Sequence, residues 1–88
     1  MANYEILIKR SATKELEALP RSYRQKVARK VSGLSSNPRP QGSEKLSGEE
    51  KYRLRQGDYR IVYEVNDGAR QVIVVTIAHR KDVYRRKK

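Results

Sequence analysis

The positions of apolar side chains divide the first part of the chain into one strand and two helices. Residues 4–8 alternate imperfectly between apolar and polar positions, which predicts a half-buried strand. Residues 11–19 have the spacing of a helix with Ser11 as its N-cap, and Pro20 ends it. A second helix begins at Pro20 or Arg21, because apolar residues recur after it at helical intervals. The three apolar rows are Tyr4, Ile6 and Ile8; Ala12, Leu16 and Leu19; and Tyr23, Val27, Val31 and Leu34.

The second half of the chain has the pattern of strands joined by turns. Two prolines within residues 35–42 exclude a helix or a central strand there, so this segment is a linker. Residues 51–65 form two strands around Gly57, and residues 66–68 (Asn-Asp-Gly) are a strong hairpin signal. Residues 71–79 are the most β-branched run of the chain, which predicts a central strand buried on much of both faces.

Together these elements predict an α+β fold in a single domain spanning residues 1–88. Its order is an N-terminal strand, two helices, and then an antiparallel sheet of three or more strands. From Arg80 onward the pattern predicts a short C-terminal helix or tail.

The two strands of residues 51–65 place several arginines on one side of the predicted sheet. Successive side chains of a strand point to opposite faces, so Arg53 and Arg55 share one face and the intervening apolar residues share the other. On the returning strand, Arg60 lies opposite to an apolar row. If both apolar rows face the core, Arg53, Arg55 and Arg60 lie together on one exposed surface. A rigid sheet positions such charges more accurately than a basic tail.

His79 is the single histidine of the chain, and its position favours a structural role over acid–base chemistry. The alternation of Ile73, Val75, Ile77 and His79 places it at the end of an apolar row. An acid–base role remains the alternative.

Charge and composition narrow the classes of partner. The formal net charge is +11 and the estimated pI is about 10.3, which favours a polyanion such as RNA, DNA or an acidic protein segment. The polar side of the second helix contributes to this charge, and it is either an ordinary solvated face or a nucleic-acid contact. Its cations are Arg21, Arg24, Lys26, Arg29 and Lys30.

The composition also predicts where the protein works. There is no cysteine, no basic leader followed by an apolar run, and no apolar stretch long enough for a membrane span. These features predict a soluble, unprocessed, cytoplasmic protein that does not engage a membrane.

Metal and serine-hydrolase chemistry are poorly supported. One histidine, no cysteine and scattered carboxylates give no spacing typical of metal ligands, so we expect no metal and no other cofactor. No serine stands in a nucleophile-elbow sequence. The arginine-rich face remains, and guanidinium groups bind phosphate and stabilise its charge in a transition state. RNA carries its own nucleophile in the 2′-hydroxyl, so a site without metal favours RNA over DNA as substrate.

Arg80 and Tyr84 form a second candidate pair after the last strand. Their i, i+4 spacing places them on one side of a helical turn. Nearby arginines lower the pKa of a phenol and make its phenolate more accessible as a proton acceptor. The alternative is a packing aromatic on a terminal helix beside a surface charge. The tyrosines of the two central strands, Tyr52, Tyr59 and Tyr63, fit core or rim packing.

Four segments in succession resemble RelE-type toxins of the RelE/ParE superfamily of toxin–antitoxin systems. These are Lys45-Leu46-Ser47-Gly48, Tyr52-Arg53-Leu54-Arg55, Asp58-Tyr59-Arg60-Ile61-Val62-Tyr63, and Ala78-His79-Arg80-Lys81-Asp82-Val83-Tyr84. Each segment alone is modestly specific, whereas their order and spacing together are more so. The resemblance covers nearly the whole chain, including the two N-terminal helices.

The resemblance implies a microbial-RNase-like RelE fold and a metal-independent, ribosome-dependent endoribonuclease that cleaves mRNA in the ribosomal A site and so inhibits translation. It implies as partners the ribosome, mRNA and a cognate antitoxin that forms a hetero-oligomer with the toxin. Carried over by motif, the catalytic positions are Arg60, Arg80 and Tyr84, with His79 as a reserve candidate for proton transfer. The implied phosphate- and RNA-binding positions are Arg53, Arg55, Lys51 and Lys81.

One departure changes the expected roles. Well-known members of the family carry lysine where this chain has Arg53 and Arg55, and arginine does not readily release a proton. These two residues are therefore expected to hold phosphate, while Tyr84 assists attack by the 2′-oxygen and leaves a 2′,3′-cyclic phosphate. Two rival functions remain: a ParE-like inhibitor of DNA gyrase, and a non-catalytic basic module that binds RNA or the ribosome.

Overall fold

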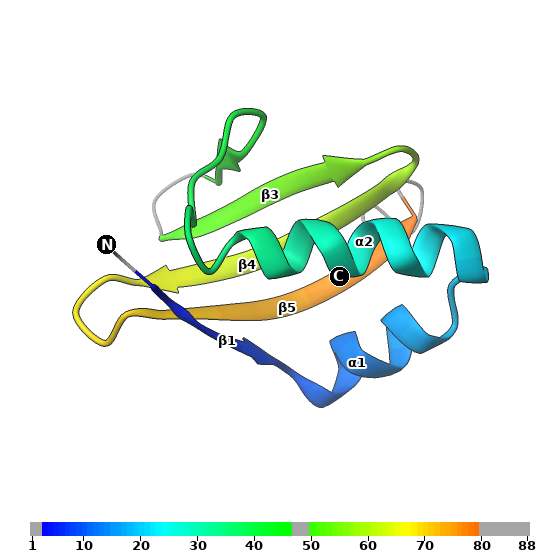
Figure 1. Cartoon of the computed structure of the whole chain (residues 1–88), viewed down its shortest axis with the longest axis horizontal. Helices are drawn as coiled ribbons and strands as arrows, with labels where there is room; N and C mark the ends of the chain where they lie inside the picture. Colours follow the sequence, from blue (N-terminus) through cyan, green and yellow to red (C-terminus); the bar gives the residue numbers. More distant parts are fainter. Residues whose placement is uncertain (1–2, 47–49, 80–88) are drawn as a thin grey trace.

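The computed structural model describes residues 3–46 and 50–79, and in it two helices lie against one face of a five-stranded sheet (Figure 1). Both helices pack on the same side, which leaves the other face of the sheet without a helix among the described residues. The elements are β1 (Glu5–Ile8), α1 (Arg10–Glu17), α2 (Arg21–Gly33), β2 (Glu44–Lys45), β3 (Lys51–Gln56), β4 (Tyr59–Asn66) and β5 (Gln71–His79). The predicted α+β order is confirmed. The predicted C-terminal helix or tail lies outside the described residues.

The sheet has the strand order β1-β5-β4-β3-β2. Strands β2 to β5 are antiparallel to their neighbours, which confirms the predicted antiparallel sheet. Strand β1 joins it as a parallel partner of β5 at the outer edge, with Glu5 opposite Gln71 and Ile8 opposite Val74. The sheet is therefore mixed, and the two chain halves meet in it.

Helix α2 contributes much of the core between helices and sheet. Val27 and Leu34 are fully buried and Val31 nearly so, as their helical spacing predicts. Tyr23 was expected in the same row, and this is wrong: it is 37% exposed, and its ring meets that of Tyr59 at 5.1 Å between centroids. Tyr23 lies in the first turn of α2, near the end of the sheet, so it rests on the rim of the core.

Helix α1 begins one residue before the predicted N-cap. Lys9 occupies the cap position without a side-chain hydrogen bond, so the prediction of Ser11 as N-cap is wrong. The backbone N–H of Lys9 donates to Val74 O at 3.0 Å, so pairing with β5 fixes where the helix starts. On its inner side, Ala12 is fully buried.

A bulge in β5 changes which residues face the core. Between Val62 and Tyr63 of β4 the register shifts by one, because Val62 pairs with Thr76 whereas Tyr63 pairs with Val74. Val72 and Val74 are consequently buried, while Ile73 and Val75 are only half-buried. The predicted apolar row Ile73, Val75, Ile77, His79 is thus wrong in its first half and holds only for Ile77 and His79.

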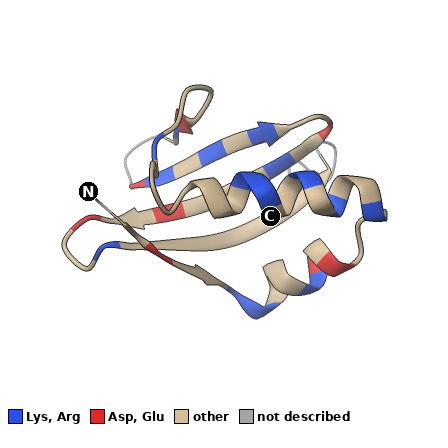
Figure 2. Ribbon diagram, viewed as in Figure 1, with Lys and Arg blue, Asp and Glu red and all other residues tan. Residues whose placement is uncertain are grey.

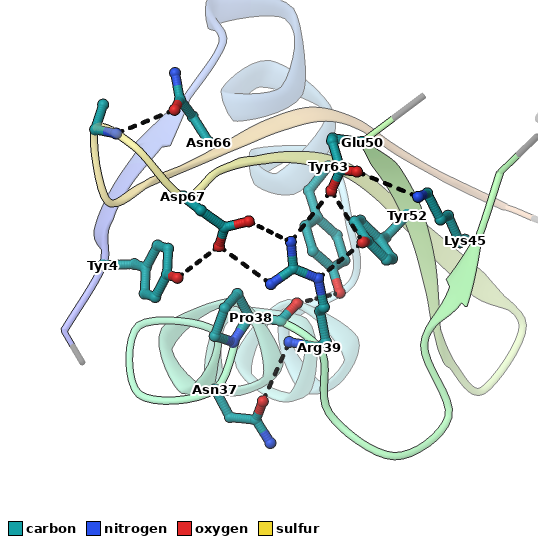
Figure 3. A network of polar contacts seen from close by, with 11 residues as sticks. Tyr4, Asn37, Pro38, Arg39, Lys45, Glu50, Tyr52, Tyr63, Asn66 and Asp67 are labelled. Carbon is teal, nitrogen blue, oxygen red and sulfur yellow. Dashed lines mark hydrogen bonds and ion pairs between the residues drawn. The ribbon is translucent and has the colours of Figure 1, made fainter. Parts of the chain in front are cut away.

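Arg39, in the linker between α2 and β2, ties the linker to the ends of two strands, β3 and β4 (Figure 3). Its guanidinium donates to Asp67 Oδ2 at 2.8 Å, to Tyr52 Oη at 2.8 Å and to Glu50 Oε1 at 3.2 Å. Tyr4 donates to the same aspartate at 2.6 Å. The linker predicted from its prolines is therefore a packed part of the domain.

No helix in the described parts of the chain has the length and apolar character needed to cross a membrane.

Candidate active site

The face of the sheet opposite α1 and α2 carries a cluster of arginines from β3 and β4. Arg55 lies directly opposite Arg60 in the antiparallel ladder, and Arg53 lies opposite Val62. Paired residues of neighbouring strands point to the same side of a sheet, so the three guanidinium side chains share one face. Figure 2 shows these positive positions gathered along the two strands. The predicted grouping of Arg53, Arg55 and Arg60 is confirmed by the register.

The three arginines differ in exposure. Arg55 is exposed and Arg53 is half-buried, with 22% of its side chain exposed. Arg60 is only 7% exposed and is a buried charged residue of the described structure, so the expectation that all three are fully exposed is wrong for it. A buried guanidinium is held in one orientation by its surroundings, which suits fixed contact with a phosphate better than a mobile side chain does.

A carboxylate from the neighbouring edge strand lies within this cluster. Arg53 donates to Glu44 Oε1 at 2.6 Å across the β2–β3 pair. The hydrogen bond and charge of Arg53, with smaller effects from the charges of Arg55 and Arg60, hold the pKa of the Glu44 carboxyl below its usual value. Arg53 therefore binds an anionic group beside Arg55 and Arg60, and a cluster of this composition has the charge and donors to bind a phosphate.

The opposite end of the same face is more acidic. Lys51 follows the alternation of Arg53 and Arg55, and its ammonium lies 3.9 Å from Glu64 Oε2 on β4. A cavity of about 420 Å³ lies there, lined by both strands and by residues of the β4–β5 connection, Asp67 among them. Lys51 is thus on the predicted face but beside carboxylates, which sets it apart from the three arginines.

His79 lies on the other face of the sheet. It pairs with Tyr59, one position from the Arg60–Ala78 pair, and neighbouring positions of a strand point to opposite sides. Its ring meets the Tyr59 ring edge-on at 5.5 Å, and it lines a cavity of about 310 Å³ that also includes Glu15 of α1. The structure therefore does not bring His79 to the arginine face, and its surroundings resemble the packing role that its apolar row predicts.

Three of the predicted site residues, Arg80, Lys81 and Tyr84, lie outside the described residues. Their grouping with Arg60 stays a prediction. Strand β5 ends with Ala78 and His79, beside the strand that carries Arg60.

Two residues of this region were not singled out from the sequence. Glu44 stands in a polar stretch after the linker, and only its pairing opposite Arg53 gives it a place in the site. Arg39 is one cation among many in the sequence, and its role depends on contacts with residues distant along the chain. Within the described residues, no group of three or more histidine, aspartate or glutamate side chains is arranged to hold a metal ion.

The sequence is similar to those of toxins from toxin–antitoxin systems. The sequence model of the family described as "ParE toxin of type II toxin-antitoxin system, parDE" matches residues 6–84. A curated relative, Toxin RelE of Mycobacterium tuberculosis, is 33% identical over 84 residues, which cover 93% of this chain and 87% of that protein.

Solved structures with the same fold come from bacterial and archaeal sources. A RelBE toxin–antitoxin complex of Mycobacterium tuberculosis contains a chain that is 26% identical, with a TM-score of 0.79 over 90% of this chain and 93% of that one. The archaeal RelE–RelB complex of Pyrococcus horikoshii OT3 gives 26% identity and a TM-score of 0.77 over 91% of this chain and 97% of that one.

Proposed function

The chain belongs to the ParE toxin family of type II toxin–antitoxin systems, and from that premise we propose that it is a RelE-type endoribonuclease that cleaves mRNA on the ribosome. The observation that carries the proposal is the placement of Arg53, Arg55 and Arg60 on one face of β3 and β4, where Arg53 binds the Glu44 carboxylate. A cluster that holds a carboxylate in this way has the charge and hydrogen-bond donors for a phosphodiester.

In the proposed reaction the 2′-oxygen of a ribose attacks the adjacent phosphorus, and the bond to the 5′-oxygen of the next nucleotide breaks. The proton of the 2′-hydroxyl goes to a base, for which Tyr84 is the candidate, and the leaving oxygen receives a proton. The products are a 2′,3′-cyclic phosphate and a new 5′-hydroxyl end. Arg60, with Arg80, stabilises the charge that builds up on the phosphate oxygens.

The roles of the remaining residues follow from their positions. Arg53 and Arg55 hold the phosphate backbone beside Arg60, and Lys51 adds positive charge at the start of β3. Lys81, which lies outside the described residues, is proposed as a further RNA-binding residue. No step requires a metal ion, because RNA supplies the nucleophile. His79 lies on the other face of the sheet, so we assign proton transfer to Tyr84 before His79.

The proposed partners are the ribosome with its mRNA and a cognate antitoxin. Two of the related toxins described above were solved as complexes with RelB antitoxins, which supports a hetero-oligomer of this chain with an antitoxin of its own. A basic toxin with a formal charge of +11 is suited to an acidic or polyanionic partner.

A ParE-like inhibitor of DNA gyrase is the second candidate. The matching family model bears the name of the ParE toxin, although the curated relative is a RelE toxin. A basic RNA-binding module without catalysis is the third. Both use the fold without needing a catalytic arginine site.

One experiment separates the three. The purified protein is incubated with ribosomes programmed with a defined mRNA, and new 5′ ends are mapped by primer extension; in parallel, gyrase supercoiling is assayed. Cleavage of ribosome-bound mRNA that is lost when the nucleotide 5′ to the cut carries 2′-deoxyribose supports the proposal, because that change removes the nucleophile. Inhibition of gyrase without cleavage supports the second candidate, and RNA binding without either effect supports the third.

A further inference from the structure

Helix α2 carries only positive charges on its polar side. Between Arg21 and Gly33 there are five cations and no aspartate or glutamate. Among the described residues, none of these cations forms an ion pair, and four of the five are exposed. Figure 2 shows positive positions along the length of α2 and no negative ones. The five residues are Arg21, Arg24, Lys26, Arg29 and Lys30.

This arrangement is unfavourable for an isolated helix. Lys26 and Lys30 are like charges at i, i+4, and Lys26 and Arg29 are like charges at i, i+3, which destabilise a helix by a few tenths of a kcal/mol per pair. Arg21 and Arg24 stand near the positive end of the helix dipole, where acidic residues are preferred and none is present. A sequence that departs from local preferences, with no compensating ion pair among residues 3–46 and 50–79, points to a ligand outside the chain.

Three of these cations line one hollow with a strand end. Lys26, Arg29 and Lys30 surround a cavity of about 160 Å³ together with Gln56, the last residue of β3. The adjacent turn residue Gly57 lies close to Tyr23 of the same helix. A Cβ atom added to Gly57 would lie 3.9 Å from the Tyr23 ring. The β3–β4 turn thus brings a neutral amide donor to the cationic side of α2.

We propose that Lys26, Arg29, Lys30 and Gln56 form a second RNA-binding surface that holds backbone phosphates of structured RNA, separate from the arginine face. This deepens the proposed function and rests on it, since a ribosome-bound enzyme must grip RNA beyond the scissile linkage. Arg55, near the same end of β3, belongs to the other face of the sheet, so the two surfaces border the β3–β4 hairpin from opposite sides. Phosphate contacts of this kind fix position and carry no sequence preference.

An acidic protein segment fits this surface less well. Protein interfaces draw most of their affinity from buried apolar and aromatic anchors. The lining here is three cations and one amide, and the exposed large apolar residues of the described structure are Leu7 and Ile8 on β1 and Tyr23 at the start of α2. Phosphate binding, in contrast, requires only cations and donors.

The test compares two triple variants that each remove three positive charges. K26Q/R29Q/K30Q alters the proposed surface, and K9Q/R10Q/K14Q alters exposed cations around the start of α1. Glutamine keeps helix propensity and most of the side-chain length. Binding of an RNA hairpin with a fully paired stem is measured at a series of salt concentrations, and thermal melting confirms that each variant is folded.

For K26Q/R29Q/K30Q we expect the slope of log affinity against log salt to become less negative by about 2 to 3. Each lost phosphate contact removes about 0.7–0.9 from the magnitude of the slope. For the control we expect a much smaller change. Equal slopes in the two variants would overturn the inference, as would an unchanged RNA affinity together with a loss of binding to polyglutamate, which would assign the surface to an acidic protein.

The outcome is distinguishable from that of the proposed function. If the wild-type chain cuts no ribosome-bound mRNA but K26Q/R29Q/K30Q still has a less negative salt slope than the wild type, the enzyme assignment fails and the RNA surface stands. If the wild-type chain cuts mRNA and the α2 variant keeps both slope and cleavage, the surface fails and the enzyme assignment stands.

Discussion

At the scale of single residues, the arginine face depends on charges whose partners are set by strand pairing. Arg60 is 7% exposed and faces Arg55 directly, and two like charges placed opposite each other in a sheet are unfavourable. Such a pair is stable when anions lie close to it, and Glu44 is one such anion. The arginine face therefore places like charges side by side, which favours the binding of an anion.

Arg60 is the residue whose loss should affect cleavage most. Replacing Arg60 with Ala is expected to lower the rate of mRNA cleavage on ribosomes by about 10² to 10³-fold, the usual cost of losing one charge-stabilising donor. Because Arg60 is buried, Arg60→Lys serves as a second variant that keeps the positive charge but not the fork of donors.

Lys14→Ala on α1 is the matched control, because it removes an exposed positive charge from the side of the sheet that the helices cover. Single-turnover cleavage is the measurement, with circular dichroism as a check on folding. A folded Arg60→Ala protein that cleaves at the wild-type rate would exclude Arg60 from the site.

Glu44 should compete with RNA for the arginines. Glu44→Gln removes the carboxylate that accepts a hydrogen bond from Arg53 in the wild-type protein. Affinity is measured for an RNA that cannot be cut because it carries 2′-deoxyribose at the cleavage position. We expect this RNA to bind up to about fivefold more tightly to the variant, which is the range of an exposed ion pair. Fluorescence anisotropy measures the affinity. Glu17→Gln, also exposed but on α1, should leave it unchanged.

Weaker binding in Glu44→Gln would mean that the carboxylate positions Arg53 for RNA and does not compete with it. Unchanged binding together with slower cleavage of ordinary RNA would instead place Glu44 in the chemical step.

At the scale of elements, the linker between α2 and β2 holds the strand ends together through one side chain. Arg39 joins Asp67 beyond the end of β4, Tyr52 of β3 and Glu50 just before β3. Its guanidinium also lies over the Tyr52 ring, 5.2 Å from the centroid. Because β3 and β4 carry the arginine face, the linker supports the site from a distance.

Replacing Arg39 with Met is expected to lower the melting temperature at neutral pH. The hydrogen bond from Arg39, followed by that from Tyr4, holds the pKa of Asp67 below its ordinary value of 3.8, so this contribution to stability is present above about pH 3.8 and is lost as the pH falls through the lowered value. The difference in melting temperature between wild type and variant should therefore shrink below pH 3.8.

Circular dichroism melts from pH 7 to pH 3 measure this effect, with Lys14→Met as a control for the lost charge. A difference that stays constant across this range would assign the stabilisation to packing of Arg39 on the Tyr52 ring and not to its ion pairs.

At the scale of the whole molecule, eight of the 21 Lys and Arg residues lie on two surfaces, three on the arginine face of β3 and β4 and five on the polar side of α2. The two surfaces border the β3–β4 hairpin from opposite sides, so each contributes its own set of charges to the binding of a polyanion.

Binding of single-stranded RNA should report how many of these charges touch phosphate. Contact with Arg53, Arg55 and Arg60 alone predicts a slope of log affinity against log salt of about −2, and contact with Lys26, Arg29 and Lys30 as well predicts about −4. Fluorescence anisotropy over a range of salt concentrations gives the slope. A slope near zero would exclude backbone phosphates as the main ligand.

Much of this structure was predictable because it depends on local periodicity. The helix rows at Val27, Val31 and Leu34 and the shared face of Arg53 and Arg55 follow from spacing within single elements. The N-cap at Ser11 and the core position of Tyr23 were predicted wrongly, because pairing of Lys9 with β5 and the tilted contact of the Tyr23 ring with Tyr59 overrode local preference.

The sequence by itself determined the class of fold, the order of its elements and the chemistry available to the site, since these depend on residue types and their intervals along the chain. Tertiary structure alone decided the bulge that turns Ile73 and Val75 from the core, the burial of Arg60, and the meeting of Glu44 with the arginines. These three features arise from pairing between strands that are separate in sequence, where a shift of one residue reverses every side chain that follows.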